Sequence, residues 1–302
     1  MASEFAAATI LSTADDLVYA EAIEAVVREE LGLRVVIAPF ALTKNMSGTG
    51  SHVWSSPIWT AMTTGMAAVN EIDDLALEAV STGQNAVTAS EAGVMTGISD
   101  KLRVGNVIGD DVVVGVGQVL GRDAARYIED TLAALFASFN GSTAVGTSGS
   151  PMVEEDLQTA LYTLELANAI GPKVCFLHPR QANDLRLNMF INSVTSSGGM
   201  PGHVATLNTE AFGEADPTNG YWTTLYGVPI YVTTACPADS TTNWIGCMMV
   251  SNYAMGLAYH WLGRTELQRD ASGRLTEVVV TSDFGVGELH DKAGVPIETD
   301  YY

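Results

Sequence analysis

The apolar positions of the chain alternate between helical and strand-like spacing, and they predict an α+β fold. The strongest helical pattern lies in residues 110–139, where apolar side chains recur every three or four positions. Its members are Val113, Val116, Leu120, Ala124, Tyr127, Ile128, Leu132, Leu135 and Phe139. A helix of this length would span about 45 Å at 1.5 Å per residue, which suits a structural spine. Asn140 and Gly141 are expected to end it, before a linker of small residues at 144–150.

Shorter helical patterns lie on both sides of this spine. Residues 13–31 predict an amphipathic helix with Thr13 as its N-cap and Gly32 after its last turn. A second helix follows Pro151 and carries three acidic residues in its first turn, where the helix dipole favours them. Residues 179–190 predict a third helix, which begins at a proline.

The stretch between the first helix and residue 80 holds two short apolar runs. Residues 35–37 predict a strand, residues 43–51 break the pattern with turn formers, and an extended run resumes after them. We therefore expect a long hairpin-like loop. Trp54 and Trp59 in this loop either pack on a neighbouring subunit or fill an ordinary core, and the sequence favours neither.

Strand-like patterns dominate the rest of the chain. Single strands are predicted at residues 85–98, 173–177, 228–232 and 245–250. A hairpin is predicted over residues 265–288, with its turn at 270–273. Residues 196–220 are rich in loop formers.

The charge balance limits the possible partners. The chain has 35 acidic and 14 basic residues, a net charge of -21 and a pI of about 4.3. Such a surface repels phosphate, so sequence-specific nucleic-acid binding is not expected. Charged residues make up 16% of the chain, below the usual figure of about 25%, which favours an oligomer with covered surface.

Cysteine usage and hydropathy indicate an intracellular, non-membrane protein. Cys175, Cys236 and Cys247 lie in apolar runs without CxxC spacing, so neither a disulfide framework nor a zinc site is expected. The first residues lack a basic stretch before an apolar one, and we expect no secretory signal. The most apolar long window, residues 244–262, contains polar side chains and is interpreted as buried strands.

One glycine pattern resembles a cofactor-binding turn. Gly115, Gly117 and Gly121 follow a strand-like triplet and precede a helical pattern. Their spacing is one residue longer than the dinucleotide-binding fingerprint, and no second parallel strand with an acidic residue follows. We interpret these glycines as positions where the spine bends or packs closely.

The remaining candidates for chemistry also fail on spacing. Residues 146–150 do not match the GxSxG nucleophile motif. Histidines stand apart in the sequence at His52, His178, His203, His260 and His290, without metal-ligand spacing. Most carboxylate pairs begin predicted helices. We therefore predict no enzyme, and no catalytic, cofactor-binding or metal residues.

The second half of the chain carries signatures of a known family. Residues 174–185 read VCFLHPRQANDL, residues 226–235 read YGVPIYVTTA, and residues 281–289 and 294–300 close the pattern. In this order and spacing, over roughly residues 80–300, the chain resembles the major capsid proteins of tailed bacteriophages. Encapsulin shells share their fold.

This resemblance implies a domain plan and a function. The plan is an N-terminal arm (1–33), an extended E-loop (34–80), a P-domain with the spine helix (81–150 and 255–302) and an A-domain (151–254). The function is a coat protein that self-assembles into pentamers and hexamers of the icosahedral head around double-stranded DNA. Its location would be the virion, assembled in the host cytoplasm.

The resemblance also implies partners beyond the chain itself. These are a portal, a decoration protein and packaged DNA without sequence-specific contacts, with no membrane. Only about a dozen residues precede the first predicted helix, so we expect a separate scaffolding protein. Lys44 lies in the loop, but the sequence does not place a cross-linking partner for it, and assembly without covalent links is expected. An encapsulin-type shell and, less favoured, a small oligomeric enzyme remain alternatives.

Overall fold

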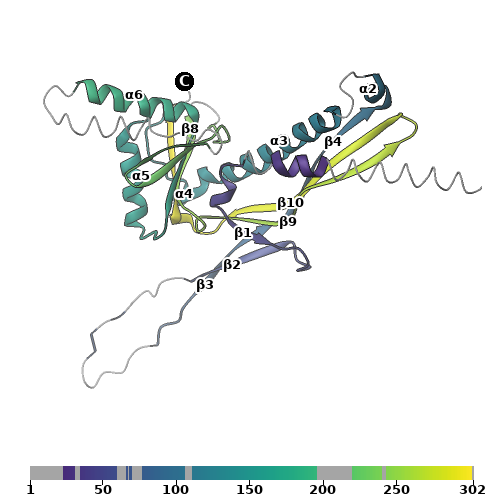
Figure 1. The fold of residues 1–302 in the computed structure, drawn as a ribbon. Coiled ribbons are helices and arrows are strands. Elements are labelled where there is room, and N and C mark those ends of the chain that lie inside the picture. Colours follow the sequence, from purple (N-terminus) through teal and green to yellow (C-terminus); the bar gives the residue numbers. More distant parts are fainter. Residues whose placement is uncertain are drawn as a thin grey trace, which may run out of the picture.

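The structure is a computed structural model that describes residues 23–30, 35–59, 66, 68–69, 77–105, 111–195, 220–239 and 243–300. A five-stranded sheet with two helices forms one end of the molecule (Figure 1). A four-stranded sheet runs away from it with a long helix alongside, and a two-stranded hairpin projects from their junction. No helix in the described part of the chain is long and apolar enough to cross a membrane. The α+β prediction is confirmed.

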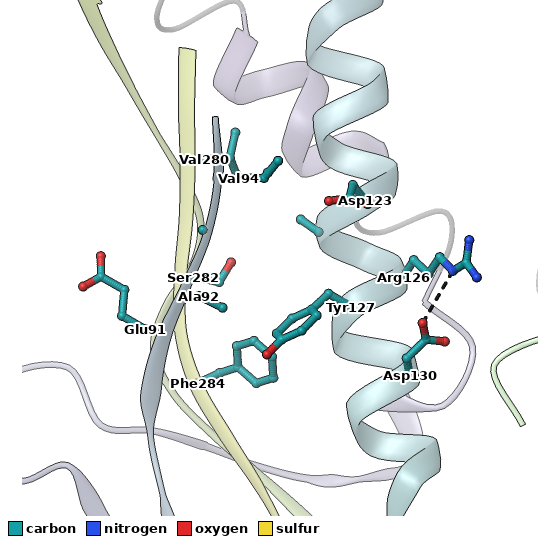
Figure 2. A pocket seen from close by; sticks show the side chains of 12 residues that line it. Glu91, Ala92, Val94, Asp123, Arg126, Tyr127, Asp130, Val280, Ser282 and Phe284 are labelled. Atoms are coloured by element: carbon teal, nitrogen blue, oxygen red, sulfur yellow. Dashed lines mark ion pairs between the residues drawn. The ribbon is translucent and has the colours of Figure 1, made fainter. Parts of the chain in front are cut away.

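The spine helix is present and tightens at its end. Helix α3 spans Asp111–Ala133 and lies beside strands β4 and β10 (Figure 2). It continues as a 3-10 helix, η2 (Ala134–Ser138), and a last turn, α4 (Phe139–Ser142). The α-helical part is therefore about 35 Å long, shorter than predicted. Asn140 and Gly141 have positive φ angles of 54° and 60°, so the predicted stop is confirmed.

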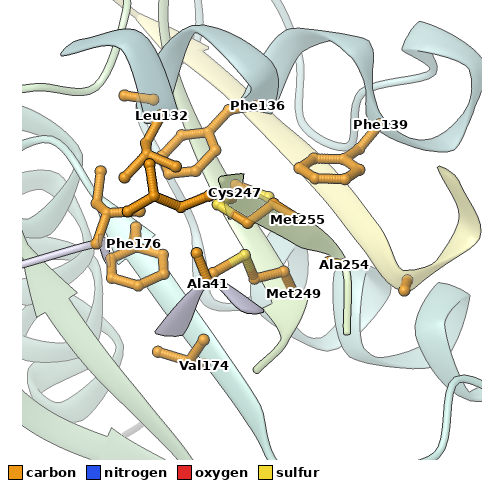
Figure 3. Packing of buried hydrophobic residues seen from close by; sticks show 14 of the residues in the cluster. Ala41, Leu132, Phe136, Phe139, Val174, Phe176, Cys247, Met249, Ala254 and Met255 are labelled. Carbon is orange, nitrogen blue, oxygen red and sulfur yellow. The ribbon is translucent and has the colours of Figure 1, made fainter. Parts of the chain in front are cut away.

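Packing explains why the last turns of the spine tighten. A 3-10 helix places residues i and i+3 on the same side. Phe136 and Phe139 have this spacing, and both are fully buried in the largest apolar cluster (Figure 3). The Phe136 ring stacks on Phe176 of the five-stranded sheet, with 5.8 Å between centroids. Burial of both rings outweighs the poorer hydrogen-bond geometry of the 3-10 form.

The five-stranded sheet is buried on both faces. Its order is β11 (Gly294–Asp300), β8 (Asn243–Val250), β5 (Lys173–Leu177), β7 (Val228–Val232) and β6 (Tyr221–Leu225), with only the β5–β7 pair parallel. Side chains alternate along β5: Val174 and Phe176 face the spine, whereas Cys175 and Leu177 face the helices. This explains the unbroken apolar runs in the sequence. Strands β5, β7 and β8 are confirmed, and β6 and β11 were not predicted.

Two helices cover the second face of this sheet. Helix α5 spans Glu154–Leu166, and its first turn holds the three predicted acidic residues. Helix α6 spans Pro179–Thr195, five residues longer than predicted. Leu157 and Leu164 of α5 pack in one cluster with Leu185 of α6 and the sheet. All three cysteines are free and buried in these cores, and burial raises the pKa of each thiol.

The four-stranded sheet has the order β1 (Leu42–Asn45), β9 (Met255–Asp270), β10 (Leu275–Glu288) and β4 (Ser90–Ser99). The predicted hairpin is confirmed as β9–β10, although β9 begins ten residues before the predicted start. Its turn is held by Asp270, whose Oδ1 accepts hydrogen bonds from the backbone N–H groups of Ser272 and Gly273. A short helix, α2 (Asp100–Gly105), follows β4.

The N-terminal predictions need correction. Residues 35–37 form no strand, and a 3-10 helix, η1 (Ala38–Phe40), follows them. Strand β1 (Leu42–Asn45) overlaps the start of the segment predicted as turns, and it pairs in parallel with β9. The hairpin consists instead of β2 (Val53–Trp59) and β3 (Thr82–Thr88). The partner of β1 is more than 200 residues away, so a local pattern could not reveal it.

The predicted first helix is confirmed over the part that the structure describes. Residues 23–30 are helical, whereas residues 13–22 and most of the predicted 196–220 loop lie outside the described residues. Residues 23–30 pack across the spine at its glycines. A Cβ on Gly117 would contact Val26, and one on Gly121 would lie 3.0 Å from the Val27 carbonyl oxygen. Close helix packing, as interpreted from the sequence, is therefore the role of these two glycines.

We predict that Gly121→Leu loosens the contact between residues 23–30 and the spine. The added side chain would have to displace the Val27 backbone, and overpacking of this kind costs about 1–3 kcal/mol. Hydrogen exchange of the amides in residues 23–30 should become faster. Gly115→Leu is the matched control, because nothing lies within 4 Å of its Cβ position and leucine favours the helix. Equal exchange in both variants would contradict this role for Gly121.

Candidate assembly surface

Strands β2 (Val53–Trp59) and β3 (Thr82–Thr88), called the projecting hairpin below, cannot be stable by themselves. Along β2 the side chains alternate between exposed and half-buried, and along β3 Val87 alone is fully buried. An isolated two-stranded hairpin is at best marginally stable in water, because neither face is covered. The stability of this hairpin therefore depends on contacts with the rest of the chain or with other chains.

The chain holds the hairpin at its base. Trp54 packs so closely on Gly256 that a Cβ there would lie 2.5 Å from its ring. Val87 packs in the same way on Gly287, and the Asn85 Nδ2 donates a hydrogen bond to the Leu289 carbonyl oxygen at 2.9 Å. Trp54 is half-buried and packs against the small apolar cluster at the hairpin base, which favours the ordinary-core alternative for this residue.

Beyond its base the hairpin exposes apolar side chains. Trp59 is 72% exposed, and Leu77 and Val80 are exposed in the segment before β3. Large apolar side chains gathered on a projecting element are typical of contact surfaces between proteins. Trp59 therefore fits the other alternative, packing on a neighbouring subunit.

A groove beside the spine is a second candidate surface. It has a volume of about 520 Å³ and lies between α3 and strands β4 and β10 (Figure 2). Tyr127 and Phe284 meet edge-on across it, 5.9 Å apart, and Arg126 pairs with Asp130 along the helix at 3.4 Å. Tyr127, Arg126 and Asp130 are exposed, whereas Phe284 is buried beneath them, so the groove offers a mixed polar and apolar contact surface.

Glu129 is the one buried glutamate among the described residues. Its carboxylate accepts hydrogen bonds from the backbone N–H groups of Ile37 and Ala38, at 2.9 and 3.3 Å. Burial raises its pKa from 4.5 to about 7, although the backbone hydrogen bonds act in the opposite direction. Its contacts tie the segment before β1 to the spine helix, so we interpret it as a structural group.

The LHPRQ signature has a structural explanation. Gln181 is fully buried, and its Nε2 lies 2.9–3.1 Å from Trp244 O, Ile297 O and Thr299 Oγ1. Its Oε1 accepts a hydrogen bond from the backbone N–H of His178 at 3.0 Å. The His178 ring stacks on Trp244, 3.5 Å away, and burial lowers its pKa to about 4. The Gln181 side chain thus joins α6 to β8 and β11.

The other sequence candidates occupy structural positions. Ser148 accepts a hydrogen bond from Asn243 Nδ2, within a loop that lies beside β11. His290 stacks on Tyr253, and His203 lies outside the described residues. Two histidines that stand apart in the sequence meet in the structure. His52 and His260 lie together with Asp283, a cluster that sequence spacing does not reveal.

The projecting hairpin and the groove expose aromatic and apolar side chains, as contact surfaces between proteins do. A sequence model of the phage capsid protein family matches residues 84–296, well over half of the chain. The chain belongs to the phage capsid protein family. A comparison with curated proteins finds no match.

Solved structures with the same fold include phage capsids and an encapsulin. A protein of Mycobacterium phage Che8 is 16% identical, with a TM-score of 0.60 over 87% of this chain and 90% of that chain. The capsid of cyanophage P-SCSP1u is 13% identical, with a TM-score of 0.59 over 89% of each chain. The holo-SrpI encapsulin complex of Synechococcus elongatus PCC 7942 is 10% identical, with a TM-score of 0.62 over 87% of this chain and 86% of that chain. The tailed-phage capsid fold that the sequence signatures imply is confirmed.

We predict that Gln181→Leu destabilises the chain by about 3 kcal/mol, since it leaves a backbone N–H and buried carbonyl oxygens without their partner. Urea unfolding would measure the loss. The exposed neighbour Asn183 is the control, and Asn183→Leu should change stability by less than about 0.5 kcal/mol. Equal midpoints for the two variants would show that the network contributes little.

We predict that Glu129 makes stability depend on pH. Between about pH 4.5 and 7 the folded chain keeps the Glu129 proton that the unfolded chain releases. The free energy of unfolding therefore falls as the pH rises through this window, by at most about 3 kcal/mol. Glu129→Gln cannot titrate, so the difference between wild type and variant isolates this effect. Parallel stability curves from pH 4 to 8 would contradict it.

Proposed function

We infer that this chain is the major capsid protein of a tailed phage. It would assemble into pentamers and hexamers of an icosahedral head that encloses double-stranded DNA. The observation that carries the proposal is the projecting hairpin, which exposes Trp59 and whose apolar surface beyond its base the chain itself leaves uncovered. Family membership and the fold support it, because both are those of structural shell proteins.

The domain plan follows the same proposal. We assign residues 1–33 to the N-terminal arm, 34–80 to the E-loop, 81–150 and 255–302 to the P-domain, and 151–254 to the A-domain. The spine helix and the long β9–β10 ribbon support the P-domain assignment. Strand β11 adds to the sheet of the proposed A-domain through β8, so this strand links the two domains.

The proposal includes partners outside the chain. A scaffolding protein, a portal and a decoration protein are expected, as is packaged DNA held without sequence-specific contacts. The net charge of -21 supports the last point, since an acidic lining repels phosphate. The virion would be the final location, after assembly in the host cytoplasm, and no enzymatic activity is proposed.

An encapsulin-type compartment is the second candidate. The similar fold of the Synechococcus encapsulin favours it. The two candidates differ in what the particles enclose: a phage head takes up double-stranded DNA, whereas a compartment encloses protein. Nuclease-protected DNA in particles purified from an infected or reconstituted system would support the phage head. Particles that hold only protein would support the compartment.

We predict that Trp59→Ser weakens assembly while the subunit stays folded. Large aromatic side chains at contacts typically contribute about 2 kcal/mol or more, so the critical concentration for assembly should rise by at least about tenfold. Negative-stain electron microscopy, with and without candidate scaffolding proteins, would count the particles. Trp59→Phe is the matched control and should retain assembly.

Two results would contradict the proposal. One is normal assembly of Trp59→Ser, which would show that the hairpin makes no essential contact. The other is a wild-type chain that stays monomeric or dimeric under every condition. Circular dichroism of each variant keeps misfolding apart from lost assembly, because Trp59 is exposed and its replacement should leave the fold unchanged.

A further inference from the structure

Three metal-binding side chains meet at the base of the projecting hairpin. His52 precedes β2, His260 lies in β9, and Asp283 lies in β10. The His260 Nδ1 is 2.9 Å from Asp283 Oδ2, and the His52 Nδ1 is 3.9 Å from the same oxygen. One ligand atom from each residue lies within 4.8 Å of the other two. The three groups come from segments about 20 to 230 residues apart in the sequence.

The polar atoms of this cluster are poorly satisfied by the protein alone. His260 Nδ1 makes no hydrogen bond despite its short distance to Asp283, and Asp283 Oδ1 has no hydrogen-bond partner. Asp283 is 3% exposed, so bulk solvent has little access to its carboxylate. Leaving a buried carboxylate oxygen and a ring nitrogen without partners is costly, unless a further atom fits between them.

The outer contact of His260 prepares it for a metal. Its Nε2 lies 3.2 Å from the carbonyl oxygen of Ser51. An Nε2–H that donates to this oxygen leaves the lone pair on Nδ1, which faces Asp283. Metal-binding histidines in proteins are commonly oriented in this way, with the second nitrogen donating to a carbonyl group.

The backbone is shaped to bring these side chains together. Between β9 and β10 the register shifts twice, at Thr281/Asp283 and at Asp283/Phe284. From Tyr259 to Arg264 strand β9 contains two more residues than the opposing part of β10. Such bulges turn side chains out of the regular alternation and are frequent beside functional sites. His52 is fixed by its own carbonyl oxygen, which accepts a hydrogen bond from Ala89 N at 2.8 Å.

We propose that His52, His260 and Asp283 bind one divalent transition-metal ion of the zinc class. Two imidazoles and a carboxylate are a common donor set for Zn²⁺, with ligand atoms about 3.3 Å apart in a tetrahedral site. The observed 2.9 and 3.9 Å lie on either side of this spacing. His52 is 73% exposed, so a fourth position is open to water or to another chain.

The metal would strengthen the attachment of the projecting hairpin. It would join the segment before β2 to both long strands, close to where Trp54 and Val87 pack on Gly256 and Gly287. Metal binding occurs within one chain, so the site does not depend on the proposed capsid function. The competing explanation is a protonated His260 that forms an ion pair with Asp283 without a metal.

The test uses the full chain after treatment with a chelator. Isothermal titration calorimetry with ZnCl₂ should give one site per chain, and ZnCl₂ should raise the thermal midpoint by several degrees, unlike MgCl₂. His52→Ala should weaken Zn²⁺ binding by at least about tenfold without unfolding the chain, because this side chain is mostly exposed. Asp283→Asn should weaken it as well. His290→Ala is the matched control and should bind Zn²⁺ as the wild type does.

Either of two results would overturn the proposal. Absence of Zn²⁺ binding to the wild-type chain would favour the ion pair. Equal affinity of wild type and His52→Ala would place any bound Zn²⁺ elsewhere. Co²⁺ provides a spectroscopic check, because its visible absorption should appear with the wild type and with His290→Ala and disappear with His52→Ala.

Discussion

The contact between the end of the spine helix and the five-stranded sheet positions everything else in this chain. Phe136 and Phe139 are buried there against Phe176 and the start of β9, and a side chain at Gly294 would collide with the Phe139 ring. The spine, the long β9–β10 ribbon and the sheet all leave from this junction. Close packing of large rings has little tolerance for displacement, so the junction holds the elongated parts at fixed angles.

Away from this junction the chain buries less and exposes more. The projecting hairpin is packed only near its base, and Trp59 lies beyond that base in contact with solvent. A single chain gains little stability from such an element, because its apolar surface stays in water. Contacts with other copies would cover this apolar surface and so stabilise the hairpin. Such contacts are expected of a member of the phage capsid protein family.

Three buried polar side chains differ in how far the protein satisfies their hydrogen bonds. Gln181 uses both ends of its amide and joins three elements. Glu129 is hydrogen-bonded to the backbone, yet burial raises its pKa to about 7, so its charged form is disfavoured. Asp283 has an oxygen without a partner, which is why a metal ion is the inference we draw there. Buried groups whose hydrogen bonds are complete are therefore interpreted as structural, whereas one with a missing partner marks a candidate site.

Local sequence patterns predicted the spine helix, the buried strands β5, β7 and β8, and the helices α5 and α6, because burial periodicity and helix-start residues act over short stretches of chain. The signatures around Gln181 also indicate the family, since they are continuous stretches of sequence. Tertiary structure alone decided that β1 pairs with β9, that β2 pairs with β3, and that His52 and His260 meet at Asp283. The physical reason is distance along the chain: strand partners and side-chain clusters from remote segments leave no periodic trace in either segment.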